Sequence, residues 1–188
     1  MPASGYITVV SGLPRSGTSL MMQMLHAGGM PVVSDGHRPH DTHNPAGYFE
    51  DVRVKRLKHD ASWLCEIPGQ AIKIVSYLLP VLPSNLNYRI LLMERPLAQV
   101  LASQGTMLAQ RASSSPEEPG VAELMQRQAD LACAWMEVQA NMPFLVVPYP
   151  HVIDDPRYWA RQINGFLDWQ LDEGAMARCV RPELHRNR

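Results

Sequence analysis

The feature that most constrains the fold of this chain is a glycine-rich turn between an apolar run and a helical segment near its start. Residues 6–10 read YITVV, which is typical of a strand buried on both faces of a parallel sheet. Residues 11–19 read SGLPRSGTS, and residues 20–27 read LMMQMLHA before two glycines that would end a helix. The sequence therefore predicts a strand, a loop and a helix in direct succession.

Three further apolar runs predict the other strands of a sheet. They lie at residues 71–75, 88–93 and 144–149 and are bounded by Pro, Asn or Gly. Helices are expected at residues 49–64, 96–111, 121–142, 155–168 and 171–180, with loops at 29–48 and 112–120. Because the strands are apolar throughout and alternate with helices, we expect right-handed βαβ units. The predicted fold class is α/β, with helices on both faces of a parallel sheet in three layers.

The helix expected at residues 121–142 has the clearest periodicity. Its apolar residues recur at spacings of three, four or seven, which is typical of a helix that turns one face to the core. These residues are Val121, Leu124, Leu131, Trp135, Val138 and Met142. The tryptophans of the chain are expected to pack in the core rather than to stack on an adenine ring.

Length and composition limit the classes of protein to which this chain can belong. With 188 residues, 46% apolar and 19% charged, it is expected to form one domain over residues 1–188. A net charge of −1 provides no overall basic field for nucleic acid or an anionic membrane. No segment approaches the roughly 20 apolar residues of a membrane span, and the first residues lack a signal-peptide pattern. The three cysteines are widely spaced without a C-x-x-C pair, so reduced thiols and a cytoplasmic location are expected.

The glycine-rich turn has the composition of a phosphate-binding loop. Gly12 and Gly17 allow the backbone to turn its N–H groups toward one anion, and the following helix adds its dipole. A Walker A loop would have Lys directly after the second glycine, where this chain has Thr18. The cation is Arg15 instead, whose guanidinium can bind phosphate or sulfate with two hydrogen bonds. The alternative is an ordinary glycine-rich turn between a strand and a helix.

Residues 12–25, which read GLPRSGTSLMMQML, resemble the 5′-phosphosulfate loop of sulfotransferases, particularly bacterial members with Pro-Arg-Ser-Gly-Thr-Ser. Those enzymes have a fold like that of P-loop nucleotide kinases, with Lys or Arg two residues before the second glycine. They use 3′-phosphoadenosine 5′-phosphosulfate (PAPS) and release adenosine 3′,5′-bisphosphate (PAP). The resemblance implies that the 5′-phosphosulfate is held by this loop, namely by Pro14, Arg15, Ser16, Gly17, Thr18 and Ser19.

A second segment resembles the 3′-phosphate site of the same family. In that family a strand ends in Arg, a helix follows, and Ser lies eight residues after the Arg. Residues 88–103 read YRILLMERPLAQVLAS and place Arg95 and Ser103 at this spacing. A phosphate between them would meet one fixed cation and one hydroxyl. The alternatives are an ion pair between Arg95 and Glu94 or another carboxylate at the sheet end, and an exposed helix position for Ser103.

Weaker similarity to the family extends over most of the chain. Residues 145–156, LVVPYPHVIDDP, resemble the family's strand followed by Tyr, a polar turn and Asp-Pro. The tail VRPELHRNR resembles the basic closing segment of bacterial members. This resemblance implies that an arginine of the tail, with Arg186 among the candidates beside Arg181 and Arg188, folds over the 3′-phosphate.

Sulfuryl transfer to a hydroxyl needs a general base, and the segment DGHRPHDTHNPAGYFED holds the candidates. Related bacterial sequences have a similar Asn-Pro-x-Gly-Tyr-Phe-Glu string, which makes Glu50 the first choice, with Asn44 and Tyr48 in the same pocket. A carboxylate at a helix N-terminus is the other role open to Glu50. His43 and His40 are further candidates for the base, because the pKa of histidine suits this task.

The histidines of this segment, His37, His40 and His43, could also suggest a metal site. They lie in a Pro- and Gly-rich loop rather than on one helix face, so their spacing carries little geometry. A solvated loop is the expected state. No metal is expected, because a sulfuryl group carries less charge than a phosphoryl group.

Lys73 is the charged residue within the apolar run AIKIV. A buried Lys is costly unless it is paired or faces a site. Sulfotransferases often have a Lys on the second strand near the transferred sulfate, so the resemblance implies that Lys73 stabilises the transition state. Arg15 is expected to stabilise the leaving phosphate. The alternative for Lys73 is a strand-end residue that extends its ammonium group to solvent.

The function expected from the sequence is sulfuryl transfer from PAPS to a hydroxyl or amine of a small-molecule, glycan or lipid acceptor. Two other interpretations stay open. One is a P-loop kinase of a small molecule, and the other is a non-catalytic nucleotide-binding domain of the same fold. The sequence indicates neither the acceptor nor the oligomeric state.

Overall fold

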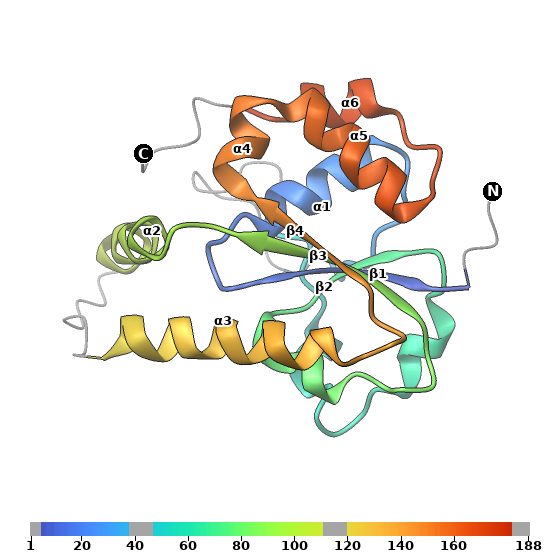
Figure 1. Cartoon of the computed structure of the whole chain (residues 1–188), viewed down its shortest axis with the longest axis horizontal. Coiled ribbons are helices and arrows are strands. Elements are labelled where there is room, and N and C mark those ends of the chain that lie inside the picture. Colours follow the sequence, from blue (N-terminus) through green and yellow to red (C-terminus); the bar gives the residue numbers. More distant parts are fainter. Residues whose placement is uncertain (1–4, 38–46, 111–119, 182–188) are drawn as a thin grey trace.

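The computed structural model describes residues 5–37, 47–110 and 120–181, and in this part of the chain four strands form one parallel sheet (Figure 1). The strands are β1 (Ile7–Gly12), β2 (Ala71–Lys73), β3 (Tyr88–Glu94) and β4 (Phe144–Pro148). Their order across the sheet is β2-β1-β3-β4, and every neighbouring pair is parallel. The carboxyl ends of the strands therefore lie at one edge, where open α/β sheets bind their ligands.

Helices cover both faces of the sheet (Figure 1). One face carries α1 (Thr18–Ala27), α4 (Tyr149–Asp154), α5 (Pro156–Leu167) and α6 (Glu173–Arg178). The other carries α3 (Val121–Glu137) and the 3-10 helices η1 (Val52–Arg56), η2 (Ser62–Glu66) and η3 (Ser76–Val81). Helix α2 (Leu97–Gln110) follows β3 beyond the carboxyl edge of the sheet. The predicted α/β fold class with three layers is confirmed.

Each strand supplies side chains to two separate cores, because successive side chains of a strand point to opposite faces. On β1, Val9 packs into the core on the α3 side and Val10 into the core around α1, and both are fully buried. All six residues of β1 are buried. Burial on both faces is the physical reason why Ile7, Val9 and Val10 are apolar, while Thr8 and Ser11 are small polar residues that are buried as well.

The predicted elements are largely present, with some ends shifted. The strand predicted at 71–75 ends at Lys73, and the one predicted at 144–149 ends at Pro148, where the chain turns into the unpredicted helix α4. The loop predicted at 29–48 is fastened to the sheet at its start. There Val33 N–H donates to the Ala71 carbonyl oxygen over 2.8 Å, beside an isolated parallel bridge.

The single helix predicted at residues 49–64 is wrong. The chain forms the two 3-10 helices η1 and η2 there instead. Asp51 starts the first by accepting a hydrogen bond from Arg53 N–H over 2.9 Å. Asp60, one residue before the N-cap of the second, accepts from Ser62 N–H over 3.0 Å. Short acidic side chains that bond their own backbone two residues on compete with a continuous helix.

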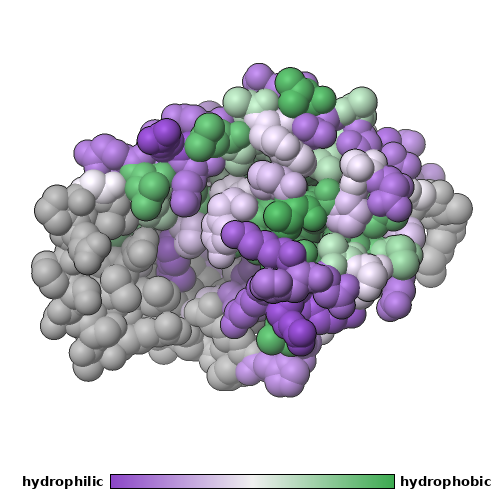
Figure 2. Space-filling model, turned by 90° about the horizontal axis from the view of Figure 1, so that it is seen from below, coloured by the Kyte–Doolittle hydropathy of each residue, from purple (hydrophilic) through white to green (hydrophobic). Residues whose placement is uncertain are grey.

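The apolar face predicted for α3 is also wrong in part. Three of its members, Leu124, Leu131 and Val138, are 57%, 60% and 76% exposed. The core takes a different face of the helix, with Met125, Ala132 and Met136 buried. Helix α3 packs on η3 with this face, for which flexible methionines and a small alanine are suited. Figure 2 views the molecule from the side of α3, where hydrophobic residues stand among hydrophilic ones on the surface.

Candidate active site

The loop between β1 and α1 has a backbone that few side chains can adopt. Gly12 and Gly17 have φ angles of 145° and 105°, and Arg15 between them has a φ of 69°. A Cβ atom at Gly12 would lie 2.6 Å from the carbonyl oxygen of Met93, and one at Gly17 would overlap the Tyr149 ring. Glycine is thus required at both positions by close neighbours as well as by φ. A non-glycine residue at positive φ is a strained conformation that is found often at functional sites.

The end of this loop has the properties of an anion-binding site. Helix α1 begins after Gly17 without a side-chain cap and has no acidic residue in its first turn. Its first N–H groups, with the positive end of the helix dipole, point toward this end. Ser16 is 1% exposed, and its Oγ has no hydrogen-bond partner among the described residues. A buried hydroxyl without a partner is costly, and an oxygen of a bound phosphate or sulfate would satisfy it.

The two predicted phosphate motifs lie side by side. Arg15 Nε donates a hydrogen bond to Ser103 Oγ over 3.0 Å. Arg95 Nη1 donates to the carbonyl oxygen of Arg15 over 3.2 Å, and Arg95 Nε donates to Gln99 Oε1 over 3.1 Å. Ser103 is 6% exposed, so the alternative of an exposed helix position is wrong.

Positive charge gathers at this place. Among the residues that the structure describes, no carboxylate lies within salt-bridge distance of Arg15. Burial lowers the pKa of the Arg95 guanidinium; the Tyr149 hydroxyl opposes this shift, and Arg15 adds to it. Arginine nevertheless keeps its charge in proteins. Two neighbouring guanidinium groups in a half-buried setting favour an anionic ligand.

Tyr149 lies at this candidate site, although no role is assigned from the sequence to the Tyr that follows the last strand. Its ring contacts Gly17, and the Arg95 guanidinium lies 4.6 Å from the ring centroid. Burial raises the pKa of the Tyr149 hydroxyl, while Arg95 and Arg15 lower it. The available signal is its place directly after β4, because side chains that follow parallel strands meet at the ligand-binding edge.

Lys73 ends β2 and turns its ammonium group into the molecule. Its side chain is 11% exposed. Its Nζ donates to the Tyr48 carbonyl oxygen over 2.6 Å and lies 3.3 Å from Glu50 Oε1 and 3.5 Å from Ser19 Oγ. These acceptors match the three hydrogens of an ammonium group. The alternative in which Lys73 extends to solvent is therefore wrong.

Glu50 pairs with this ammonium group and does not start a helix. The N-cap of η1 is Asp51, whose carboxylate accepts a hydrogen bond from Arg53 N–H. The helix-terminal role considered for Glu50 therefore belongs to its neighbour. Phe49, directly before Glu50, has a φ of 50°, so the backbone is strained next to this carboxylate as it is at Arg15.

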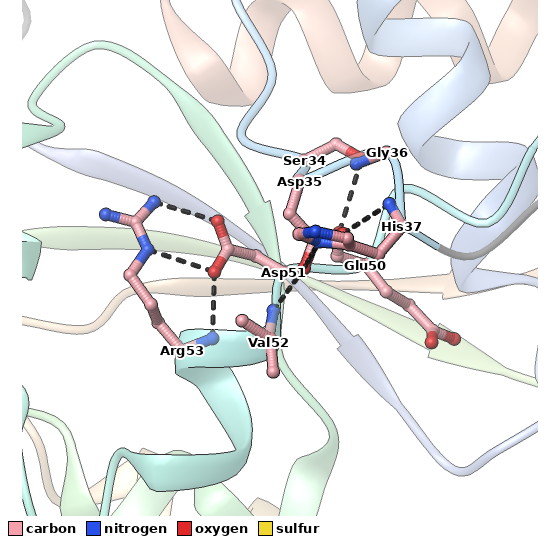
Figure 3. A network of polar contacts seen from close by, with 8 residues as sticks. All are labelled: Ser34, Asp35, Gly36, His37, Glu50, Asp51, Val52 and Arg53. Atoms are coloured by element: carbon pink, nitrogen blue, oxygen red, sulfur yellow. Dashed lines mark hydrogen bonds and ion pairs between the residues drawn. The ribbon is translucent and has the colours of Figure 1, made fainter.

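A polar network fastens the backbone around Glu50 (Figure 3). Asp35 N–H and Ser34 Oγ donate to the Glu50 carbonyl oxygen over 3.0 and 3.3 Å. Asp35 Oδ2 accepts from Val52 N–H over 2.6 Å, and Asp35 Oδ1 accepts from His37 N–H over 2.8 Å. The Glu50 side chain leaves this network on the side away from Asp51 (Figure 3).

Some predicted site residues lie outside the described residues, namely His40, His43, Asn44 and Arg186. The described His37 lies 3.3 Å from Asp35 Oδ2 and pairs with it when protonated. In residues 5–37, 47–110 and 120–181, no group of three or more His, Cys, Asp or Glu is arranged to hold a metal ion. Within the same ranges, no helix is both long and apolar enough to cross a bilayer.

Comparisons with known proteins identify the fold. No protein-family model matches this sequence, and no curated protein matches it either. Among solved structures, it is similar to the mouse sulfotransferase SULT7A1 complexed with PAP, with a TM-score of 0.56 and 17% identity. That alignment covers 94% of this chain and 63% of the mouse chain, so this chain spans less than two thirds of that protein. A sugar kinase from Janibacter sp. HTCC2649 aligns with a TM-score of 0.47 and 10% identity, over 95% of this chain and 97% of the kinase. The chain therefore shares the P-loop α/β fold of a sulfotransferase, as the motifs around Arg15 and Arg95 predict.

Proposed function

We propose that this chain is a PAPS-dependent sulfotransferase. The observation that carries the proposal is the meeting of two phosphate motifs at one edge of the sheet, through the hydrogen bond between Arg15 and Ser103. A ligand with two separated phosphates requires two such anion sites on one molecule. That the solved sulfotransferase of this fold was crystallised with PAP supports the same ligand class here.

The residues present fit such a ligand. The loop from Pro14 to Ser19 would hold the 5′-phosphosulfate with the first N–H groups of α1, and the unpartnered Ser16 hydroxyl would donate a hydrogen bond to one of its oxygens. Arg95 and Ser103 would hold the 3′-phosphate. The Tyr149 ring, packed on Gly17, keeps the Arg95 guanidinium close to the loop. Bound PAPS would supply the sulfuryl group for transfer.

The other side of the loop carries the groups for proton transfer and charge stabilisation. Glu50 would accept the proton that the acceptor hydroxyl or amine loses, since its carboxylate is partly exposed and held in place. Lys73 would offset negative charge on the sulfuryl oxygens, with Ser19 between its ammonium group and the loop. Arg15 would stabilise the charge that builds on the leaving phosphate.

The chemistry of the loop argues against phosphoryl transfer from ATP. Thr18 stands where a P-loop kinase has the Lys that contacts the β- and γ-phosphates. The cation has moved to Arg15, which hydrogen-bonds to Ser103 on the 3′-phosphate side. The small-molecule kinase and the non-catalytic nucleotide-binding domain are therefore the outcomes against which the proposal is tested. The acceptor class proposed is a small molecule, a glycan or a lipid with a free hydroxyl or amine.

Calorimetric titration distinguishes these functions. The purified chain is titrated with PAP and, in parallel, with ATP and magnesium. Tight binding of PAP with weak binding of ATP is the expected result and leads to an acceptor screen with PAPS. Binding of ATP without binding of PAP would instead assign the chain to the kinases. PAP binding with no transfer to any acceptor class, and no effect of Glu50→Gln on donor consumption, would leave a nucleotide-binding domain.

A further inference from the structure

Asp35 connects the segment that ends at residue 37 with the segment that begins at residue 47, through hydrogen bonds to Glu50 and Val52. Its backbone N–H donates to the Glu50 carbonyl oxygen over 3.0 Å. Its carboxylate Oδ2 accepts from Val52 N–H over 2.6 Å (Figure 3). Asp35 therefore holds the two peptide groups that flank Asp51, and the first of them is the peptide group directly after Glu50.

The remaining contacts hold Asp35 itself in position. Its Oδ1 accepts from His37 N–H over 2.8 Å, and His37 Nδ1 lies 3.3 Å from Oδ2. The hydrogen bond from the His37 backbone is the main cause that lowers the pKa of the Asp35 carboxyl. The group is thus ionised at neutral pH, and an ionised carboxylate accepts backbone N–H groups more strongly than a neutral side chain does.

Fixing the backbone at Glu50 decides where its carboxylate can reach. A glutamate has a flexible side chain with several rotamers, so the direction of its Cα–Cβ bond limits the positions of its oxygens. The carboxylate reaches the Lys73 ammonium group at 3.3 Å, and the preceding Phe49 is at positive φ. A strained backbone conformation persists only where neighbouring contacts hold it. Asp35 supplies such a contact at Glu50, the residue after Phe49.

We propose that Asp35 is a positioning residue, which orients the Glu50 carboxylate toward Lys73 by holding the backbone of residues 50–52. The contact between Glu50 and Lys73 is seen in the structure, and its catalytic meaning rests on the proposed sulfotransferase function. In the described contacts, Asp35 bonds neither the glycine-rich loop nor Arg15 or Arg95. Its loss should therefore leave PAP binding intact.

A double-mutant cycle tests this without any assay of activity. Urea unfolding of the whole chain is measured for wild type, Glu50→Gln, Lys73→Met and the double variant, which gives the coupling between the two side chains. The cycle is repeated with Asp35→Ala in all four proteins, where the coupling is expected to fall to about a third or less. Asp35→Asn keeps one oxygen for Val52 N–H and is expected to restore part of the coupling. Asp60→Ala is the matched control, because Asp60 makes a similar turn with Ser62 but no contact with Glu50.

Each outcome decides the question. Undiminished coupling in the Asp35→Ala series, with lower overall stability, would mean that Asp35 only stabilises the fold. If the cycle in the wild-type background shows no coupling, the proposal is overturned, because it requires that Glu50 and Lys73 interact. If Asp35→Ala does not fold, the Asp35→Asn series decides. The coupling between Glu50 and Lys73 is then expected to decrease about twofold, and an unchanged coupling would contradict the proposal.

A transfer assay with PAPS adds the functional arm. Asp35→Ala is expected to lower kcat toward the value of Glu50→Gln while the Kd of PAP stays within about twofold. A weaker PAP affinity with unchanged kcat would contradict a positioning role. Absence of transfer by wild type, with the cycle as expected, would count against the sulfotransferase function and not against the role of Asp35 in orienting Glu50.

Discussion

Arg15 and Ser103 lie 88 positions apart in the sequence, and Nε of the first donates a hydrogen bond to the hydroxyl of the second over 3.0 Å. The order of the strands makes this contact possible. Arg15 follows β1, Ser103 lies on the helix after β3, and β1 and β3 are paired in register along six residues of each. The elements that follow two neighbouring parallel strands therefore meet at the ligand-binding edge.

Removal of the Arg15 guanidinium should weaken PAP binding strongly. A hydrogen bond to a charged group contributes about 1.5–3 kcal/mol, so Arg15→Ala is expected to raise the Kd of PAP by about 10- to 100-fold. Ser103→Ala removes a neutral partner and should cost about fivefold, from about 1 kcal/mol. Isothermal titration calorimetry measures both. Arg161→Ala, at an arginine that is 76% exposed, is the control and should leave the Kd unchanged; equal affinity for PAP in all of these proteins would remove Arg15 from the site.

Glu50→Gln should separate catalysis from donor binding. General base catalysis contributes about 10²- to 10⁴-fold to the rate, and the amide keeps nearly the same shape without a basic oxygen. We expect kcat for transfer from PAPS to fall within that range while the Kd of PAP changes little. Steady-state kinetics with an acceptor found by screening provide the measurement. A variant with full kcat would move the role of base to one of the histidines, His40 or His43.

Gly17→Ala should be more harmful than the same change at another glycine of similar φ. Gly17 and Gly29 have φ angles of 105° and 94°, but only at Gly17 would the new Cβ meet the Tyr149 ring, since nothing lies within 4 Å of one at Gly29. Both changes cost about 1 kcal/mol or more for the strained backbone, and overpacking adds about 1–3 kcal/mol at Gly17. Urea unfolding gives both values. Equal losses would show that the ring can move aside at little cost.

The pair of Asp51 and Arg53 should make stability depend on pH in the acid range. The side-chain hydrogen bonds from Arg53 lower the pKa of Asp51 in the folded protein, against the opposing effect of its burial. A lowered folded-state pKa stabilises the protein above the unfolded value of 3.8 and loses this effect as pH falls through the folded value. Asp51→Asn should thus lower the free energy of unfolding at pH 7. The loss should be only about 1 kcal/mol, because the partly exposed Arg53 guanidinium is screened by solvent. In a series of urea unfolding curves, the difference in unfolding free energy between wild type and this variant should shrink as pH falls below about 4. A constant difference would mean that the charge of Asp51 does not matter.

The two faces of α3 should respond differently to truncation. Met136 is 1% exposed and Leu131 is 60% exposed. Met136→Ala should cost about 2–5 kcal/mol because it leaves a cavity, whereas Leu131→Ala should cost less than about 1 kcal/mol. Urea unfolding of both variants checks which face is in the core. A larger loss at Leu131 would mean that this face is covered in solution.

The local parts of the fold and site could be predicted from the sequence. Residues 6–27 predict β1, the glycine-rich loop and α1 because their apolar pattern and glycines act over a few neighbouring residues. The spacing of Arg95 and Ser103 could be recognised for the same reason, since one strand and one helix contain both. Predictions failed at two places. In one, side-chain hydrogen bonds to the backbone compete with a helix, and in the other, packing decides which face of a helix is buried. Asp51 and Asp60 break a helix that periodicity favours, and α3 buries methionines instead of leucines.

By itself, the sequence determined an α/β chain with a parallel sheet and predicted two phosphate-binding motifs. Hydrophobic periodicity, the conformational freedom of glycine and the chemistry of each residue are local properties. Only the tertiary structure decided which side chains meet. It placed Arg15 beside Ser103 and Tyr149 against Gly17. It also turned Lys73 inward to Glu50. These contacts depend on the strand order β2-β1-β3-β4, which arises from packing of the whole chain and is not encoded in any short stretch of it.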